Sequence, residues 1–241
     1  MTRFRKFFSP KFIFGRILVS FILGSRVKTG PFKGTKLRRN ISINLFYSKL
    51  LGVYEMELHQ LIWNILNKTF RSIIVVGTAE GYYYSGLLRY AKYEKIIGFE
   101  MDDGLREICN INAKNNYAEK KFSLLGTCST KELKKVTLGN DFIIMDCEGE
   151  EKILLNPDEI PNLTKTEIVV ECHDIFSSGI TDTLQKRFSN SHNITKIQAR
   201  TPSHRDFPFL PVFLTKYLRH TITGILTERP PHMHWLHLTP K

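Results

Sequence analysis

Carboxylates and one histidine come directly after two apolar runs of the sequence. Asp146 and Glu148 follow the run Phe-Ile-Ile-Met, and Glu171 and His173 follow the run Ile-Val-Val. A carboxylate at the end of a buried strand costs free energy unless it binds a partner, so such positions are candidates for chemistry. A histidine near carboxylates can act as a general base, belong to an oxygen-rich metal site, or only link neighbouring loops. We predict Asp146, Glu148, Glu171 and His173 as the catalytic residues.

A glycine turn and a later acid form a second set of candidate residues. Gly77 and Gly81 give the spacing G-x-x-x-G, and Glu100 follows nineteen residues after Gly81. Glycines at such a turn let backbone N–H groups approach a ligand, and an acid at this separation can accept hydrogen bonds from the two hydroxyls of a ribose. The pattern predicts a nucleoside-bearing cofactor, although a turn that needs glycine only for packing is the simpler alternative. The predicted cofactor-binding residues are Gly77, Thr78, Ala79, Glu80, Gly81, Tyr82, Glu100, Met101, Cys128 and Asp146.

These positions require strands that end at one edge of a sheet. Apolar runs predict strands over 72–77, 95–100, 121–126, 141–146, 167–171, 193–199 and 233–239. Helical periodicity between them predicts helices near 58–66, 84–91, 105–109, 131–136, 150–155, 180–188 and 211–225. The alternation indicates an α/β fold with an open, mostly parallel sheet and helices on both faces. Ligands of such sheets bind at the carboxyl ends of the strands.

The positive charge of the chain is concentrated at its N-terminus. The 241 residues carry a net charge of +12, and residues 1–54 contain twelve Lys and Arg and no Asp or Glu. The other 23 basic residues equal the 23 acidic ones, so a nucleic-acid partner is a poor expectation. We predict a basic N-terminal arm over 1–46 that packs on the domain as a helix. Peripheral contact of the arm with an anionic membrane is the alternative.

Two further features concern the compartment. The apolar stretch 12–24 is shorter than the ~20 residues that a spanning helix needs, and Arg16 interrupts it, which also argues against a secretory signal. The four cysteines form no C-x-x-C pair, and Cys147 and Cys172 are expected to be buried thiols. Both features favour a cytoplasmic protein, with membrane association through the arm as a possibility.

The order of these motifs resembles the FkbM-type class I methyltransferases. The glycine turn continues as Gly-Tyr-Tyr, and Gly98 to Glu100 reads G-F-E. The segment from Asp146 to Glu151 reads D-x-E-G-x-E, and Val170 to His173 reads V-E-x-H. The resemblance covers about residues 47–176, and D-x-E-G-x-E is its most specific part.

The resemblance implies a methyltransferase that uses S-adenosylmethionine to methylate a hydroxyl of a small molecule or a glycan. It implies a Rossmann-like class I fold, with a seven-stranded sheet whose last strand is antiparallel. The methyltransferase domain would span 47–241, with a core over 70–176 and a substrate-side region over 177–241. Related enzymes often carry an acid where this chain has Val75, and Glu80 or Asp146 could take its role. Asp146 and Glu148 would lie near the methyl group, and His173 or Glu171 would take the acceptor proton.

Three alternatives remain open at the level of the sequence. A nicotinamide-dependent oxidoreductase shares the ribose acid, but the turn lacks G-x-G-x-x-G. A catalytically inactive binding protein with the same fold would explain Val75, although such a protein need not retain paired acids. No metal is predicted; nevertheless, Asp146, Glu148, Glu171 and His173 could offer ligands to a divalent ion, as in catechol-type O-methyltransferases.

Overall fold

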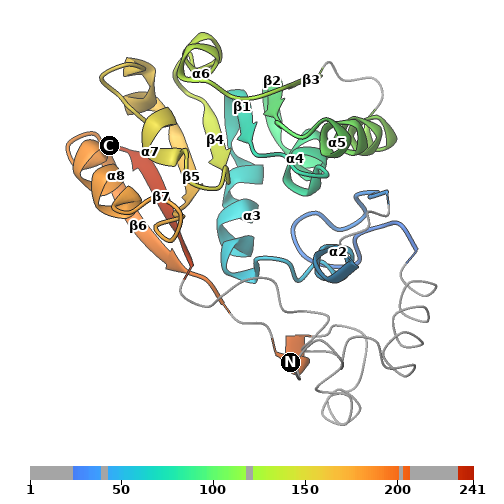
Figure 1. Ribbon diagram of the computed structural model, residues 1–241. Helices are drawn as coiled ribbons and strands as arrows, with labels where there is room; N and C mark the ends of the chain where they lie inside the picture. The colour runs from blue at the N-terminus through green and yellow to red at the C-terminus, as the bar shows by residue number, and fades with distance from the viewer. Residues whose placement is uncertain (1–23, 39–42, 118–121, 201–202, 207–232) are drawn as a thin grey trace. The chain divides into compact units, whose positions relative to one another are not determined.

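A computed structural model describes residues 24–38, 43–117, 122–200, 203–206 and 233–241 (Figure 1). The chain divides into two compact units. Unit 1 comprises Met1–Met56 and Arg200–Arg229, and unit 2 comprises Glu57–Ala199 and Pro230–Lys241. The expected helix at 211–225 and most of the expected N-terminal arm lie outside the described residues. The predicted boundary at residue 46 therefore stays a prediction.

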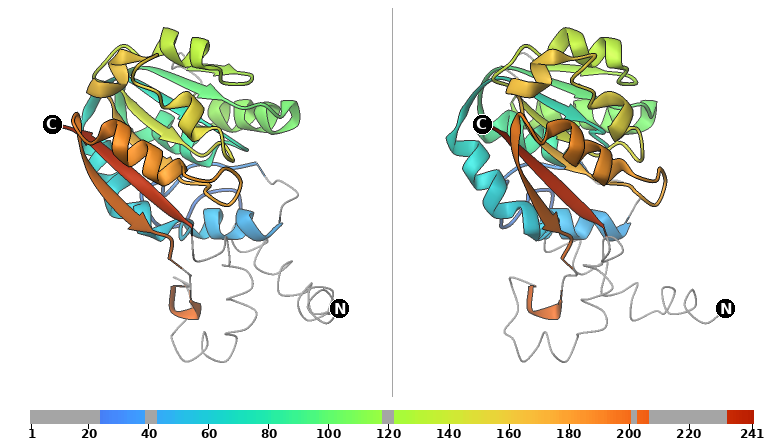
Figure 2. Two further views of the ribbon diagram at one scale, coloured as in Figure 1. Left: turned by 60° about the vertical axis from the view of Figure 1, so that its left-hand side comes forward. Right: turned by 90° about the vertical axis from the view of Figure 1, so that its left-hand side faces the viewer.

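Unit 2 is built on a seven-stranded sheet with the order β3-β2-β1-β4-β5-β7-β6. Strands β1 to β5 are paired in parallel, and β7 is antiparallel to both of its neighbours, β5 and β6. Figure 2 shows β7 and β6 crossing the molecule side by side near the C-terminus. The strands are β1 (Thr69–Val76), β2 (Lys92–Phe99), β3 (Phe122–Leu125), β4 (Phe142–Met145), β5 (Glu167–Glu171), β6 (His192–Gln198) and β7 (His234–Pro240).

The helices of unit 2 form two groups, one on each side of the sheet. Helices α4 (Tyr82–Tyr90) and α5 (Asp103–Asn116) pack against each other, while α7 (Glu151–Leu154) contacts both α6 (Thr130–Val136) and α8 (Ile180–Phe188). Figure 1 shows α4 and α5 on one side of the strands and α7 and α8 on the other. Helix α3 (His59–Asn67) leads into β1, and short 3-10 turns lie at Met56–Leu58 and Pro161–Lys165.

The core between the sheet and the α6–α8 group follows from the two-residue period of the strands. Alternate residues such as Ile74, Val76, Ile143 and Met145 point to one face and are buried there. Apolar side chains of the helices complete this cluster, among them Leu133, Leu154, Leu184 and Phe188. Every residue of β4 and of β5 is buried, as expected for strands covered on both faces.

The observed elements agree with the predicted alternation. Each predicted strand is present within a few residues, and the antiparallel strand expected near 233–239 is β7. The sheet is mixed, because β7 lies between β5 and β6 with reversed direction. Helix α5 is longer than the predicted 105–109 segment and runs to Asn116. It begins at Asp103 because the Asp102 side chain accepts a hydrogen bond from Leu105 N.

Unit 1 contains a loop over 24–38, helix α2 (Ile43–Leu51) and a 3-10 turn at His204–Asp206 among its described residues. Arg26 pairs with Lys36 across the loop, and Lys28 N donates to Leu50 O. A Cβ atom on Gly52 would lie 2.0 Å from Thr29 O, so this contact requires glycine. No helix within the described ranges has the length and apolar character needed to cross a membrane.

Candidate functional site

The glycine turn after β1 is pressed against the end of β4. Gly77 has φ +78°, and a Cβ atom there would lie 1.7 Å from Asp146 O. Gly77 N and Thr78 N both donate to Phe99 O at 3.0 Å, which ties the turn to the end of β2. Only glycine allows this backbone conformation and this approach together. The turn therefore gathers the carboxyl ends of β1, β2 and β4 at one point of the sheet edge.

Glu100 holds the turn in place. Its Oε2 accepts a hydrogen bond from Ala79 N at 2.7 Å, and its Oε1 accepts one from Asp102 N at 3.0 Å. Ala79 has φ +46°, a conformation that is strained for alanine and that the bond to Glu100 helps to fix. The Glu100 carbonyl oxygen in turn accepts from Arg106 Nη1 at 2.7 Å. The carboxylate is thus oriented before any ligand binds, and each oxygen keeps a lone pair for a further donor.

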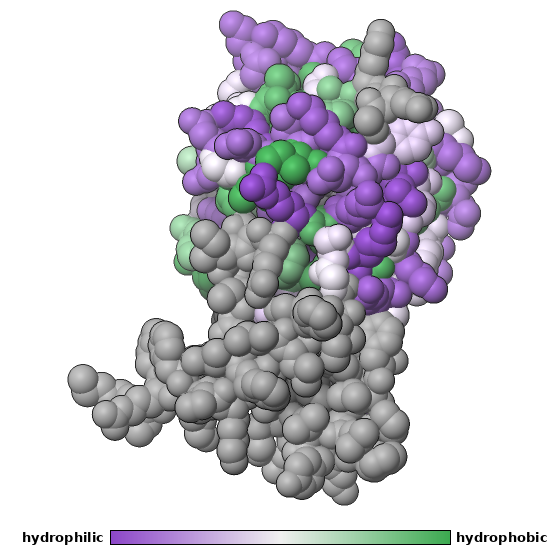
Figure 3. All heavy atoms as spheres, turned by 90° about the vertical axis from the view of Figure 1, so that its right-hand side faces the viewer, coloured by the Kyte–Doolittle hydropathy of each residue, from purple (hydrophilic) through white to green (hydrophobic). Residues whose placement is uncertain are grey.

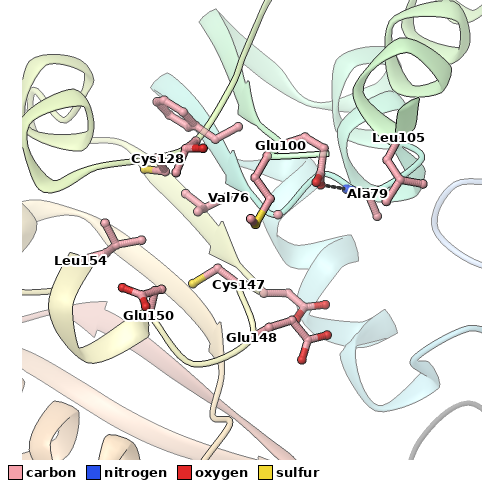
Figure 4. A pocket seen from close by; sticks show the side chains of 14 residues that line it. Val76, Ala79, Glu100, Leu105, Cys128, Cys147, Glu148, Glu150 and Leu154 are labelled. Atoms are coloured by element: carbon pink, nitrogen blue, oxygen red, sulfur yellow. Dashed lines mark hydrogen bonds between the residues drawn. The ribbon is translucent and has the colours of Figure 1, made fainter. Parts of the chain in front are cut away.

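A cavity of about 280 Å³ opens beside this carboxylate (Figure 4). Six of the ten predicted cofactor-binding residues line it: Gly77, Ala79, Glu100, Met101, Cys128 and Asp146. Figure 4 shows Ala79 and Leu105 on one side of the cavity and Glu150 and Leu154 on the opposite side. The cavity therefore lies at the carboxyl edge of the sheet, where the sequence predicts a ligand.

The other four predicted cofactor-binding residues do not line this cavity. Thr78 and Tyr82 are buried, and the Glu80 carbonyl oxygen accepts from Asn112 Nδ2 at 2.8 Å. A Cβ atom on Gly81 would lie 2.7 Å from Cys109 Sγ. Gly81 thus allows close packing of α4 and α5, which is the simpler alternative considered for a glycine in this turn.

Sequence reasoning missed several residues that line the cavity: Val76, Phe99, Leu105, Thr127, Cys147, Glu150 and Leu154. Val76 and Phe99 are the last residues of β1 and β2, so their position at the strand ends could have indicated them. Leu105 and Leu154 come from helices, and only tertiary packing brings them to the cavity. Cys147 was expected to be a buried thiol; it is half-buried and lines the cavity, whereas Cys172 is buried as expected.

The four predicted catalytic residues meet around one imidazole. His173 Nε2 lies 3.5 Å from Asp146 Oδ1, 3.5 Å from Glu148 Oε2 and 3.8 Å from Glu171 Oε2. Asp146 and Glu148 also line the cavity, so this group of side chains borders it. We call Asp146, Glu148, Glu171 and His173 the His173 cluster.

Glu151 completes the surroundings of His173 and was not predicted as a site residue. Its Oε1 lies 2.6 Å from His173 Nδ1 and accepts from Gly149 N at 3.1 Å. The side chain is completely buried, and Oε2 has no hydrogen-bond partner among the described residues. Its place as the last acid of D-x-E-G-x-E was the signal that could have identified it. The ring of Phe176 stacks on His173 with the centroids 5.7 Å apart.

The charges of the His173 cluster act on one another. Burial and the neighbouring Asp146 carboxylate raise the pKa of Glu171 to about 10. Burial lowers the pKa of His173, but the hydrogen bond to Glu151 and the nearby carboxylates outweigh it, so that the pKa is raised. Crowded acids of this kind strongly favour a positive charge among them. The cluster can therefore hold a proton or a cation beside the cavity.

No model of a protein family matches this sequence, and no curated protein matches it either. Precorrin 8W decarboxylase from Methanobacterium thermoautotrophicum has a similar structure, with 14% identity, a TM-score of 0.51, and coverage of 76% of this chain and 89% of that one. The O-methyltransferase TomG from Streptomyces achromogenes, solved with S-adenosylmethionine, is 14% identical to this chain with a TM-score of 0.49. The match covers 77% of this chain and 79% of TomG. Spermidine synthase from Thermotoga maritima is 13% identical with a TM-score of 0.48. That match covers 73% of this chain and 56% of the enzyme, so this chain spans little more than half of its length. The likeness to the decarboxylase shows a shared α/β fold.

Proposed function

We propose that this protein is an S-adenosylmethionine-dependent methyltransferase. The observation that carries the proposal is the position of the Glu100 carboxylate. Hydrogen bonds from Ala79 N and Asp102 N orient it, and it lines a cavity at the carboxyl edge of the sheet. A carboxylate after the second strand is placed to bind ribose hydroxyls.

The size of the cavity favours this cofactor over a dinucleotide. Its volume of about 280 Å³ is slightly below the usual volume of ligand pockets, which is about 300 to 1000 Å³. A single nucleoside with a short side chain suits such a space better than two joined nucleotides. The absence of G-x-G-x-x-G from the turn points the same way.

The acceptor is proposed to be a hydroxyl of a small molecule or a glycan. Methyl transfer to a hydroxyl forms an oxygen–carbon bond, breaks the sulfur–carbon bond and releases one proton. The His173 cluster borders the cavity and would receive this proton or stabilise the resulting charge. The FkbM-type assignment belongs to the same proposal and rests on the D-x-E-G-x-E and V-E-x-H patterns.

Related enzymes often carry an acid at the position of Val75, and another residue of this chain must take over its role. Val75 is buried within β1, and Asp146 lines the cavity from the neighbouring strand end, whereas Glu80 does not line it. We therefore assign to Asp146 the contact with the methionine part of the cofactor.

Calorimetric titration with S-adenosylmethionine tests the proposal. We expect saturable binding to the wild-type chain and strongly weakened binding to Glu100→Ala and Glu100→Gln. Glu94→Gln is the matched control, because Glu94 is exposed at the opposite end of β2. Circular dichroism shows whether each variant is folded. Absence of binding by folded wild-type protein, together with a fluorescence change of reduced nicotinamide cofactor, would favour the oxidoreductase instead.

A further inference from the structure

The Nε2 atom of His173 is surrounded by acids without being hydrogen-bonded to them. His173 is 2% exposed, and Nε2 has three carboxylate oxygens at 3.5 to 3.8 Å. N–H···O bonds are normally 2.7 to 3.2 Å long, and in the described part of the chain no hydrogen bond of Nε2 meets that geometry. The buried Nε2 atom therefore faces three carboxylate oxygens, and its distance to each of them is longer than a hydrogen bond.

This separation suits the ligand shell of a metal ion. One ligand atom each from Asp146, Glu171 and His173 lies within 4.8 Å of the others. A divalent ion with bonds of about 2.0 to 2.2 Å holds its ligand atoms roughly 3 to 4 Å apart. The distances from His173 Nε2 to Asp146 Oδ1 and Glu171 Oε2, 3.5 and 3.8 Å, lie within this range.

Glu151 fixes the histidine in the form that binds metal. Its carboxylate lies 2.6 Å from Nδ1, which holds a proton on Nδ1, so a cation that displaces the proton of Nε2 would meet the Nε2 lone pair on the side of the acids. Histidines that bind metals commonly donate their second N–H to a carboxylate in this way. A lone pair that faces carboxylates is stabilised when a cation occupies the space between them. Glu151 is therefore an independent indication of a ligand at this point.

We propose that Asp146, Glu171 and His173 bind a divalent cation, with Glu151 orienting the imidazole. One imidazole together with carboxylates suits a divalent first-row transition-metal ion, such as Mn²⁺, Fe²⁺ or Zn²⁺. Glu148, whose side chain is 70% exposed, is the most accessible acid of the cluster and would face an acceptor that enters from solvent. The site itself rests on side-chain geometry alone.

The part of the cation in the reaction rests on the proposed function. A cation held by these residues would lower the pKa of an acceptor hydroxyl beside it, as bound metals do for water. The oxygen of this hydroxyl would attack the methyl carbon, the bond from that carbon to sulfur would break, and the hydroxyl proton would leave to Glu148. His173 would then act as a ligand and not as the base, which separates this mechanism from the metal-free one.

Titration of Mn²⁺ followed by electron paramagnetic resonance tests the site on the full chain. Binding removes the signal of free Mn²⁺, and we expect one saturable equivalent per chain. His173→Gln and Asp146→Asn should abolish it, and Glu151→Gln should weaken the affinity by about 10- to 100-fold. Glu159→Gln should leave the affinity unchanged, because Glu159 is an exposed acid that bonds to Asn156 outside the cluster.

The outcomes distinguish the two proposals. Wild-type protein that binds no Mn²⁺, or folded Asp146→Asn and His173→Gln variants that bind it as wild type does, would overturn the cation site. S-Adenosylmethionine titrated in the presence of chelator reports separately on the cofactor cavity. Cofactor binding without Mn²⁺ binding leaves the methyltransferase proposal intact, and Mn²⁺ binding without cofactor binding leaves only the cation site.

Discussion

At the scale of residues, the site depends on a glycine as much as on its charged side chains, because at Gly77 any side chain would clash with a neighbouring backbone. Gly77 lets the end of β1 touch the Asp146 carbonyl oxygen, and Asp146 itself then borders both the cavity and the His173 cluster. A displacement at residue 77 would therefore move a predicted catalytic acid. The same turn carries Ala79, whose N–H is bound by Glu100.

Gly77→Ala should destabilise the protein. The left-handed backbone alone costs about 1–3 kcal/mol for a residue other than glycine, and the contact with Asp146 O adds to it. Urea unfolding measures the difference. Gly126→Ala is the control, because its nearest neighbour would be Arg106 Nη1 at 3.9 Å, and its effect should stay within about 0.5 kcal/mol. Equal stability of the two variants would contradict the close contact at Gly77.

At the scale of elements, the reversed strand β7 is attached to β5 by charge as well as by its backbone. Glu167 at the start of β5 accepts from His237 Nε2 of β7 at 2.9 Å and from Lys68 Nζ, just before β1, at 2.8 Å. Burial raises the pKa of Glu167, but these two hydrogen bonds outweigh it and lower the pKa below its ordinary 4.5. One carboxylate therefore links three strands at the edge opposite the cavity.

This link should make stability depend on pH in acid. Because the folded pKa is lowered, the stabilisation by Glu167 is complete above about pH 4.5 and is lost as the pH falls through the folded value. Glu167→Gln should lower the free energy of unfolding by about 1–3 kcal/mol at pH 7, and the difference from wild type should shrink progressively as the pH falls below 4.5. Urea unfolding across this range measures both effects.

A surface pair provides the comparison for this prediction. Glu132 bonds Lys135 at 2.7 Å on α6, where both side chains are exposed. Glu132→Gln should change the free energy of unfolding by no more than about 0.5 kcal/mol at any pH. A loss in Glu167→Gln that is no larger than this, or one that stays constant as the pH falls below 4.5, would show that Glu167 does not act through its charge.

The same scale shows which parts of the fold a sequence can indicate. Apolar runs predicted each strand. The runs of β4 and β5 are continuous because these two strands are buried on both faces. The position of β7 between β5 and β6 was not predicted, since it depends on pairing between segments separated by the whole of 199–233. The helix at Glu151–Leu154 is a single turn, so its pattern alone could not show that Leu154 reaches the cavity.

At the scale of the whole molecule, the basic charge and the chemistry occupy different parts of the chain. Residues 1–54 hold twelve basic and no acidic residues, whereas every residue that lines the cavity lies between Val76 and Leu154. The coloured residues in Figure 3 are mostly hydrophilic, with small separate apolar areas among them. Binding of the cofactor should therefore be independent of the N-terminal charge.

Removal of residues 1–23, which carry five Lys and Arg, tests this independence. We expect calorimetry to give the same affinity for S-adenosylmethionine with and without this segment, and a lowered affinity would contradict the separation. Sedimentation with phosphatidylserine vesicles distinguishes the two interpretations of the arm. Membrane contact predicts binding that weakens on truncation, by about 1 kcal/mol for each charge near the surface, and a packed helix predicts no binding by either chain.

The sequence by itself determined the alternation of strands and helices, the edge at which a ligand would bind, and the acids and histidine that meet there. It could do so because strand ends are marked by local composition, and parallel strands bring their carboxyl ends to one edge. Only the tertiary structure decided which residues of the glycine turn face the cavity, that Gly81 serves packing, and that Glu151 orients His173. Those facts depend on contacts between elements, and side-chain distances across a sheet are not encoded in the spacing of residues along one chain.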